Sequence, residues 1–414
     1  SRPCRTHDDL IRSLIVFFIA AVTLAFFFSI SPGHTRGDFD VYYDAGRHYL
    51  AGAPLYVPHG GLEEFKYLPL FALVFSPLSL LEKVPALYCW GLFNILLLYG
   101  MFFLLCGMKP VSLRDGKSLL FLACLFALTG RYIIADLRIG QANILLCFLM
   151  FLTMDLEIRG RSFAAAVVLA FSLTIKLFPL LFLFYFIITR RFKAAGATLA
   201  MAAVFLLLPA VHSGFGRNLD YLREWFLLLR SSPPAIFSSV KNFSLFSFFS
   251  RLFLFGHDPA THPVSPAVYA AWALSCLAFL GVFFGGTVLR RHDGPEVKYA
   301  DYACLFVCAL LFNPLAYLNA FVLLIVPYFF LLHFIFFSKP EKGVASIVAT
   351  VLFLGFLVMA AYNHPLWRDR LLEYKPLMWV NISVCLCLGL VKRAGRREEG
   401  VLDRPGSGQV RRAA

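Results

Sequence analysis

The chain has 414 residues, of which 60% are hydrophobic and only 15% are charged, and its mean hydropathy is +0.74. A soluble domain needs a more polar surface than this, so the composition excludes a soluble protein and predicts a polytopic membrane protein. The formal net charge of +14 does not indicate nucleic-acid binding, because the Lys and Arg residues lie in short runs between apolar segments, where membrane topology accounts for them.

The apolar runs are long enough to form membrane-spanning helices. LIVFFIAAVTLAFFFSI (14–30) and VYAAWALSCLAFLGVFFGGTVL (268–289) approach or exceed the roughly 20 residues that a helix needs to cross the hydrocarbon. Such runs recur along the whole chain, which favours helices over a barrel. We expect an all-α polytopic membrane protein with about twelve transmembrane helices and with interfacial helices in the external loops.

Basic residues near the start of the chain predict that this end is cytoplasmic. A first helix at about 10–30 then delivers residues 31–85, the first external loop, to the outside. We expect this helix to be retained, because no small-residue motif for cleavage follows it. The short apolar segment 67–81 contains two prolines and is expected to lie at the outer interface or to insert only partly, so that the second span begins near Ala86. With this arrangement every later turn rich in Lys and Arg lies in the cytoplasm.

A long external loop is predicted at 212–265. Within it, residues 218–230 have apolar side chains at helical spacing, which indicates an interfacial amphipathic helix. We interpret residues 1–393 as one transmembrane domain and residues 394–414, which contain Gly, Pro and Arg, as a disordered cytoplasmic tail. The chain shows no internal repeat of the kind found in inverted-repeat transporters.

The cysteines do not indicate a metal site. Nine of the ten lie in apolar stretches and are interpreted as small hydrophobic residues, and their spacing fits neither a disulfide framework nor a metal centre. No nucleotide-binding loop, HExxH or GxSxG motif is present. We therefore expect no metal and no cofactor.

The first external loop concentrates acidic and aromatic residues. The stretch GDFDVYYDAGRHYLAGAPLY (37–56) contains Asp38, Asp40 and Asp44 among four tyrosines. Asp44 is interpreted as the N-cap of a short helix that ends near Gly52. Asp38 has apolar neighbours close to the membrane face, so its carboxylate is expected to be partly desolvated and more basic, with Asp40 as a helper. The alternative is that these carboxylates are simply solvated.

The stretch GRYIIADLRIGQAN, a predicted external turn, has polar residues that interrupt two apolar runs. Four of them are candidates for binding: Arg131, Arg138, Gln141 and Asn143. A helix cap would account for Asn143 alone, but not for all four residues. The turn is therefore a candidate binding site.

Lys176 places a charge between two apolar stretches, each shorter than a normal span. Ionisable groups at such a depth are costly and often functional, and Pro179 would leave a broken turn in which the ammonium can meet an anion. A lysine that extends to the membrane surface is the alternative. Further along, Lys241 and Asn242 precede a phenylalanine-rich run that would contact lipid tails, a lipid substrate or the interface.

Taken in order, these residues resemble glycosyltransferase family 87, the polyprenyl-phosphate-mannose-dependent mannosyltransferases of the GT-C superfamily. The resemblance covers about residues 10–335 and is carried by five short segments: DFDVY (38–42), GAPLY (52–56), YLPL (67–70), GQAN (140–143) and KLFP (176–179). It implies a GT-C-type fold and a catalytic base in the first external loop, which aligns with Asp38. It also implies a Pro-x-x-Trp-x-His-type segment, which here reads NPLAYLN (313–319), with Asn319 in place of the histidine.

The chemistry that the resemblance implies needs one base. A sugar joined to a lipid phosphate already has a good leaving group, so no acid is required, and attack opposite the phosphate inverts the anomeric centre. The leaving phosphate needs positive charge, which Lys176, Arg131 and Arg138 can supply. The residues expected to bind sugar or acceptor are Asp40, Tyr42, Gln141, Asn143, Lys241, Asn242 and Asn319.

We therefore expect an inverting glycosyltransferase that moves a hexose from a polyprenyl-phosphate donor to a lipid or glycan acceptor. Mannose is the expected sugar, and a pentose is the alternative. The site should face the periplasm or the outside of the inner membrane, and no nucleic-acid partner is expected. A transporter or flippase of lipid-linked glycans is the alternative from another class, and a non-catalytic scaffold of the same fold is a third.

Overall fold

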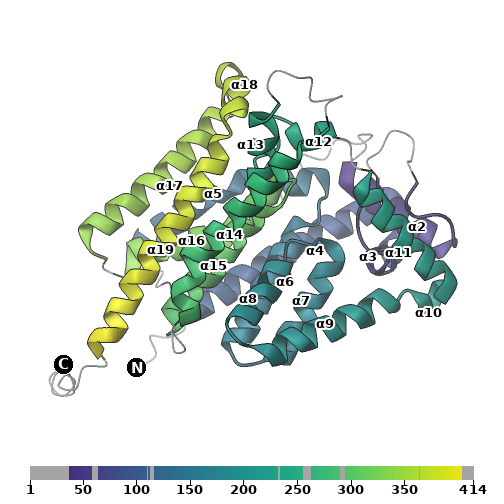
Figure 1. The fold of residues 1–414 in the computed structure, drawn as a ribbon, viewed down its shortest axis with the longest axis horizontal. Helices are drawn as coiled ribbons and strands as arrows, with labels where there is room; N and C mark the ends of the chain where they lie inside the picture. Colours follow the sequence, from purple (N-terminus) through teal and green to yellow (C-terminus); the bar gives the residue numbers. More distant parts are fainter. Residues whose placement is uncertain are drawn as a thin grey trace. The chain divides into compact units, whose positions relative to one another are not determined.

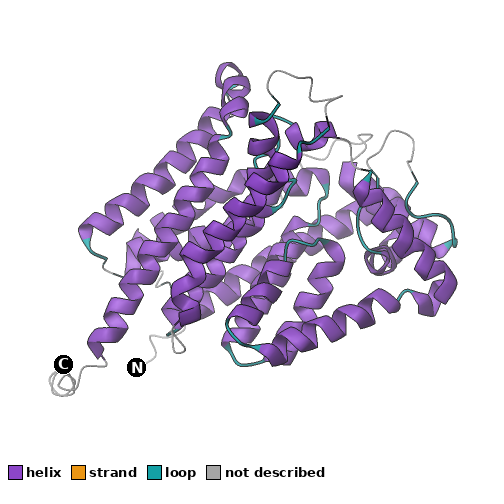
Figure 2. Cartoon of the chain, viewed as in Figure 1, coloured by secondary structure: helices purple, strands orange, loops and turns teal. Residues whose placement is uncertain are grey.

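A computed structural model of the chain describes residues 37–57, 64–109, 111, 116–231, 234–254, 263–289, 294–338, 340–362 and 364–402. Every regular element in these ranges is a helix (Figure 2), which confirms the predicted all-α fold class. The predicted first span at 10–30 lies outside the described residues.

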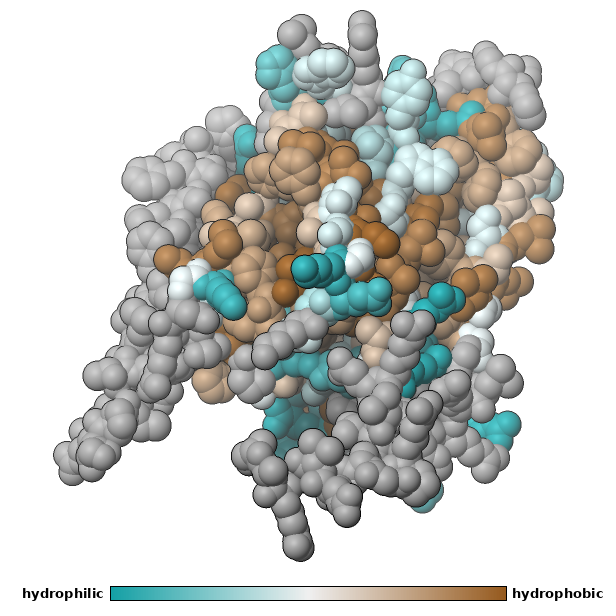
Figure 3. Space-filling view, turned by 90° about the vertical axis from the view of Figure 1, so that its left-hand side faces the viewer, coloured by the Kyte–Doolittle hydropathy of each residue, from teal (hydrophilic) through white to brown (hydrophobic). Residues whose placement is uncertain are grey.

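Seven helical segments in the described part of the chain are long and apolar enough to cross a membrane. They are Lys83–Met108, Gly116–Ile139, Phe192–Ser213, Pro266–Gly285, Leu318–Phe337, Lys342–Tyr362 and Pro376–Arg396. Apolar residues also cover much of the described surface that is in view in Figure 3. The multi-pass membrane class is confirmed, and the total of about twelve spans stays a prediction.

Where the sequence predicts one domain, the chain forms two compact units, which are described separately. The first holds the described residues up to Leu119, together with Thr129–Ile236 and Tyr317–Leu323. The second holds Leu120–Leu128, Phe237–Ala316 and the described residues from Leu324 onward.

The first unit begins with α2 (Gly37–Leu50), which packs against α3 (Pro69–Ser79) (Figure 1). α2 starts seven residues before Asp44, so the interpretation of Asp44 as an N-cap is wrong. The reason is that Phe39, Tyr42 and Tyr43 lie at helical spacing and are all buried, so burial of this aromatic face extends the helix toward the N-terminus. α3 has only 11 residues, too few to cross a membrane, in agreement with its predicted placement outside the spans.

The helices after α4 (Lys83–Met108) and α5 (Gly116–Ile139) are short. They are α6 (Asn143–Ile158), α7 (Ser162–Ile175), α8 (Leu180–Ile188) and α9 (Phe192–Leu207), and α7 packs between α6 and α9 (Figure 1). The break between α7 and α8 contains Lys176, and Pro179 precedes α8, as the sequence predicts. This break keeps both α7 and α8 short.

After α10 (Ala210–Ser213), the amphipathic helix predicted in the long loop is present as α11 (Phe215–Arg230). It exposes apolar side chains on one side and buries Tyr221 on another. The Tyr221 hydroxyl donates to the Ala53 carbonyl at 2.9 Å, and Trp225 Nε1 donates to the Lys66 carbonyl at 3.1 Å. α11 therefore holds the chain that follows α2.

The second unit contains the remaining helices: α13 (Leu245–Leu252), α14 (Pro266–Leu289), α15 (Pro295–Phe312), α16 (Ile325–Phe337), α17 (Lys342–Tyr362), α18 (Pro365–Tyr374) and α19 (Pro376–Leu402). α15 packs against α16 and α19, and α19 also packs against α17 (Figure 1). The short α12 (Pro234–Ser238) and the 3-10 helix η1 (Leu318–Leu324) lie where the chain passes between the units. α19 continues to Leu402, so residues 394–402 are helical where the sequence predicts a disordered tail.

Candidate active site

The site in the first unit is organised by the turn between α5 and α6. Gly140 has φ +67°, a left-handed conformation that favours glycine. A Cβ atom on Gly140 would lie 2.5 Å from Phe39 Cβ, closer than real Cβ atoms approach one another. The glycine therefore lets the turn touch the first turn of α2. Because Asp38 immediately precedes Phe39, this contact also fixes the position of Asp38 relative to the turn.

Hydrogen bonds from three other parts of the unit hold the same turn. The Gln141 side-chain carbonyl accepts from the Tyr42 hydroxyl, from the Tyr67 hydroxyl at 2.8 Å and from the next backbone N–H at 3.0 Å. Trp90 Nε1 donates to the carbonyl of Gly140 at 2.8 Å. The oxygen of Gln141 is thus used within the protein, so a sugar would have to contact its NH₂ group.

Tyr42 belongs to the core and not to a sugar-binding surface. Its side chain has no exposed area, and the rings of Tyr67, Phe71, Phe75 and Trp90 meet it edge-on at centroid distances of 4.9 to 6.3 Å. Burial raises the pKa of Tyr42 well above its usual value, and the nearby Tyr67 and Asp38 raise the pKa further. The predicted role of Tyr42 in binding sugar or acceptor is therefore corrected to a structural one.

Asp40 is also a structural residue. It is 1% exposed, and its carboxylate pairs with the Lys83 ammonium at 2.9 Å. This ion pair joins α2 to the start of α4. The structure thus provides no role for Asp40 as a helper of Asp38 or as a sugar ligand.

Asp38 lies in the first turn of α2 and is half-buried. Its charge acts on the Tyr42 hydroxyl and on the carboxylate of Asp136. Among the three aspartates of this stretch, Asp38 is thus the one next to the α5–α6 turn and still accessible. These are the properties expected of a base.

Asp136 is a functional candidate that the sequence reasoning missed. It lies near the end of α5 with no exposed area. One carboxylate oxygen accepts from Asn143 Nδ2 at 2.8 Å, and the other accepts from the backbone N–H of Ile144 at 3.2 Å. The available signal was an aspartate inside the apolar run YIIADLRI, because ionisable residues within apolar helices are commonly functional.

Asn143 joins Asp136 to Lys176. Its NH₂ group donates to Asp136, and its carbonyl oxygen accepts from the Lys176 ammonium at 2.6 Å. Both ends of the amide are therefore used, which corrects the prediction that Asn143 binds sugar or acceptor. Lys176 is half-buried in the break between α7 and α8, and the backbone N–H of Leu68 donates to the Thr174 carbonyl beside it at 3.2 Å.

Arg131 and Arg138 stay predicted ligands of the phosphate. Both lie on α5, where Arg131 is half-buried and Arg138 is exposed. A separation of seven residues puts them on one face of the helix, two turns apart. Asp136 is five residues from Arg131 and two from Arg138, and this spacing places Asp136 on a different face of α5. Helical geometry therefore does not bring the arginines to the side of α5 that meets Lys176.

A narrow hollow next to this turn has an empty volume of about 180 Å³. Asn94 lies in its wall, together with Trp90, Gln141 and apolar residues of α4 and α5. Asn94 Nδ2 donates to the Trp90 carbonyl at 2.9 Å, while its buried Oδ1 has no hydrogen-bond partner among the described residues. This volume is below the roughly 300–1,000 Å³ of typical small-molecule sites, so the hollow is too small to hold a sugar and its lipid.

Three predicted sugar or acceptor residues lie elsewhere. Asn319 is half-buried in η1 of the first unit, whereas Lys241 and Asn242 belong to the second unit. Lys241 is exposed, and Asn242 has no exposed area. Only Lys241 and Asn319 thus remain open to a ligand.

Asn242 connects backbone segments of the second unit. Its NH₂ group donates to the Pro314 carbonyl at 2.7 Å, and its carbonyl oxygen accepts from the Ala316 N–H at 2.9 Å. The Lys375 ammonium, at the left-handed junction between α18 and α19, donates to backbone carbonyls within 239–242. Asn242 is therefore corrected from a ligand-binding residue to one that holds the 314–316 segment.

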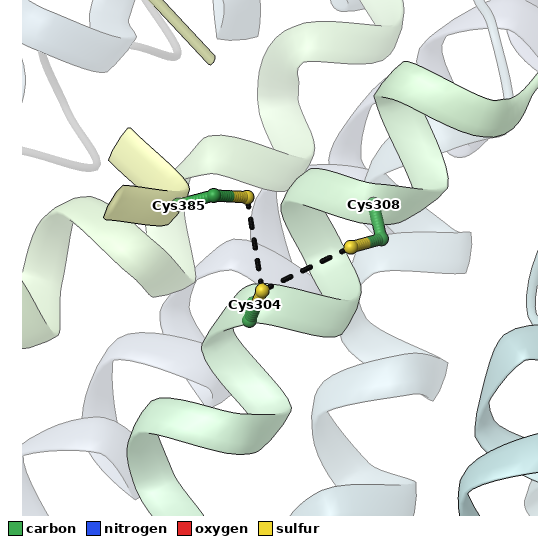
Figure 4. Close-up of side chains that lie close together, drawn as sticks. All are labelled: Cys304, Cys308 and Cys385. Atoms are coloured by element: carbon green, nitrogen blue, oxygen red, sulfur yellow. Dashed lines mark hydrogen bonds between the residues drawn. The ribbon is translucent and has the colours of Figure 1, made fainter. Parts of the chain in front are cut away.

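Three cysteines of the second unit form a cluster that their sequence spacing did not reveal. Cys304 and Cys308 lie one turn apart on α15, and Cys385 comes from α19 (Figure 4). Cys304 Sγ lies 3.8 Å from Cys308 Sγ and 3.7 Å from Cys385 Sγ. Two sulfur ligands of a tetrahedral zinc ion, each with a bond of about 2.3 Å, would be about 3.8 Å apart, so the spacing suits a soft metal ion.

The same spacing arises when neutral sulfur atoms pack in contact. All three cysteines have no exposed area, so three thiolates without a bound cation would carry a large desolvation cost. Neutral thiols that pack as small hydrophobic groups account for the cluster at no such cost.

The sequence model of glycosyltransferase family 87 matches residues 65–317. The match includes Asp136, Asn143 and Lys176, and it begins after Asp38. The part of the site built from α5, α6 and α7 therefore lies entirely within the family match.

Two relatives carry the same descriptive name, polyprenol-phosphate-mannose-dependent alpha-(1-2)-phosphatidylinositol mannoside mannosyltransferase. The protein of Mycobacterium tuberculosis is 29% identical over 221 residues, which cover 48% of this chain and 50% of the relative. The protein of Mycolicibacterium smegmatis is 26% identical over 302 residues, which cover 67% of this chain and 64% of the relative. The chain thus spans less than two thirds of the length of either relative. Because the family match extends over more than half of the chain, the protein belongs to glycosyltransferase family 87.

Proposed function

We propose that the protein is an inverting mannosyltransferase that takes mannose from a polyprenyl-phosphate donor and transfers it to a hydroxyl group of a lipid or glycan acceptor. The names of the two relatives support the donor, since both are described as polyprenol-phosphate-mannose-dependent. One observation carries the proposal: the α5–α6 turn touches Phe39, the neighbour of Asp38, at Gly140, and the same turn holds the Lys176 ammonium through Asn143 at 2.6 Å. The turn thereby joins the segment that carries the proposed base to the segment that carries the cation for the phosphate.

The proposed reaction assigns one task to each of these two side chains. Asp38 accepts the proton of the acceptor hydroxyl, whose oxygen attacks the anomeric carbon of the sugar from the side opposite the phosphate. The bond between the anomeric carbon and the phosphate oxygen breaks, and the polyprenyl phosphate leaves with the electron pair. The Lys176 ammonium stabilises the charge that develops on the leaving phosphate. No acid is needed, because the phosphate is already a good leaving group, unlike the alcohol released in glycoside hydrolysis.

The remaining assignments complete the proposal. Asn319, which also belongs to the first unit, contacts sugar or acceptor. Arg131 and Arg138 lie on another face of α5, so they raise the positive potential of the unit without a direct contact to the phosphate. The active site faces the outside of the inner membrane, where the predicted topology puts the first external loop. Lipid-linked sugar is then a co-substrate and no separate cofactor takes part.

Replacing Asp38 with Asn tests the proposed base. Purified protein in detergent is incubated with polyprenyl-phosphate [¹⁴C]mannose and a membrane extract, and the labelled product is quantified. Asp38→Asn should lower the transfer rate by about 10²- to 10⁴-fold, the usual contribution of a positioned base. Asp44→Asn is the matched control, because Asp44 lies on the same helix and is also half-buried. Its rate should stay within a few-fold of the wild type.

Two results would reject the proposal. The first is full transfer activity in the Asp38→Asn variant. The second is movement of labelled lipid-linked sugar across vesicles by the wild type without any new glycosidic bond, which is the behaviour of a transporter or flippase.

A further inference from the structure

We propose that Asp136 is a positioning residue, which acts through Asn143 to set the direction of the Lys176 ammonium toward the donor phosphate. The inference rests on the proposed function, in which Lys176 binds that phosphate. The chain of contacts joins three helices: Asp136 ends α5, Asn143 begins α6, and Lys176 follows α7.

The first step concerns which way the Asn143 amide points. An ionised carboxylate only accepts hydrogen bonds and an ammonium only donates them. Asn143 lies between the two, at 2.8 Å from Asp136 and 2.6 Å from Lys176. Only one orientation satisfies both neighbours, with NH₂ toward Asp136 and C=O toward Lys176. The opposite orientation would place like partial charges together at both contacts.

The second step concerns what holds the Asp136 carboxylate itself. Its second oxygen accepts from the backbone N–H of Ile144 at 3.2 Å, in the first turn of α6. Both oxygens are therefore occupied, and the group has no exposed area. The position of the carboxylate is therefore fixed by the packed helices, and the positive potential at the N-terminus of α6 stabilises its charge.

The third step concerns Lys176, which is half-buried and carries a long flexible side chain. An ammonium has three donors, and the bond to Asn143 uses one of them in a fixed direction. Without this bond, the ammonium would lose one of its fixed contacts, and its direction toward a bound phosphate would be less well defined. The geometry thus links Asp136 to phosphate affinity although Asp136 itself is too deeply buried to touch the donor.

The direction in which Asp136→Asn changes phosphate affinity distinguishes a positioning role of Asp136 from a purely electrostatic one. Asp136→Asn removes a negative charge near Lys176, so charge alone predicts that a phosphate binds more tightly. It also removes the acceptor that fixes the Asn143 amide, since an asparagine can present either end to its neighbour. Positioning therefore predicts that a phosphate binds more weakly.

The test measures binding of a long-chain polyprenyl phosphate, and of the corresponding free polyprenol, to the full chain in lipid nanodiscs. We expect the dissociation constant for the phosphate to rise about tenfold in Asp136→Asn and in Asn143→Ala, as for loss of one hydrogen bond to a charged group. Binding of the polyprenol should not change. The double variant should bind no more weakly than Asn143→Ala alone, because both substitutions break the same chain.

Asp155→Asn is the matched control. Asp155 is also a buried aspartate, 4% exposed, but it pairs with Arg159 at the other end of α6 at 2.8 Å. Its variant should bind the phosphate as the wild type does. Thermal unfolding of each variant shows whether it is folded, and Asn143→Ala carries the test if Asp136→Asn does not fold.

Unchanged or tighter phosphate binding in both single variants would overturn the inference, and so would additive losses in the double variant. Because binding is measured directly, it does not depend on turnover. Absence of sugar transfer by a wild type that shows the expected binding pattern would reject the proposed function and leave the positioning chain in place. Absence of phosphate binding by the wild type would overturn both.

Discussion

The contact between Gly140 and Phe39 should support both stability and activity, and Gly140→Ala tests this. Gly140 has φ +67°, where an L-residue is about 1–2 kcal/mol less stable. The added methyl group would also lie 2.5 Å from Phe39 Cβ, so either the turn or α2 must move. Overpacking of this kind costs about 1–3 kcal/mol, so we expect a total loss of about 2–5 kcal/mol in unfolding free energy.

Gly160 provides the control that separates the two contributions. It has φ +75° and no atom within 4 Å of an added Cβ, so Gly160→Ala should lose only the backbone term of about 1–2 kcal/mol. Unfolding is followed by circular dichroism in detergent, and transfer activity is measured at a temperature where both variants are folded. Gly140→Ala should lose activity because Asp38 moves with Phe39, while Gly160→Ala should not. Equal destabilisation of both variants, or normal activity of folded Gly140→Ala, would show that the contact with Phe39 supports neither stability nor the position of Asp38.

Two further predictions concern buried polar groups. Lys392→Met removes the cation bound to Asp301, which has no exposed area, and should lower the free energy of unfolding by about 3–5 kcal/mol. The double variant Asp301→Asn/Lys392→Met should recover part of this loss, because no unpaired buried charge remains. A double variant that is less stable than Lys392→Met would contradict this prediction. Burial raises the pKa of Tyr42, so above about pH 10 its hydroxyl ionises in the unfolded chain before it ionises in the folded protein. The stability that the protonated hydroxyl provides is therefore present below about pH 10 and is lost as the pH rises toward the folded pKa. The stability deficit of Tyr42→Phe relative to the wild type should therefore shrink above pH 10 in unfolding curves, and a deficit independent of pH would show that this titration does not contribute.

The helices and their interruptions could be predicted largely from the sequence. The short α3, the break at Lys176 and the amphipathic α11 all lie where the local pattern places them. Helix formation, proline breaks and amphipathic spacing depend on residues within a few positions of one another, so a window of sequence contains the necessary information. The ends of helices were less predictable. Burial of one face extends α2 beyond its capping signal, and α19 continues into residues that the sequence predicts to be a disordered tail.

The roles of the polar residues were decided by the tertiary structure. Three aspartates lie within seven residues of one another, yet Asp40 is paired with Lys83 and only Asp38 lies half-buried beside the α5–α6 turn. Asp136 became a candidate only when α5, α6 and α7 brought it to Asn143 and Lys176. Composition and local periodicity are enough to predict the membrane class, the helices and the residue types available for the chemistry. Which carboxylate is buried, which is accessible and which amide is already bound depend on the helix faces that meet, and those contacts join residues far apart in the chain.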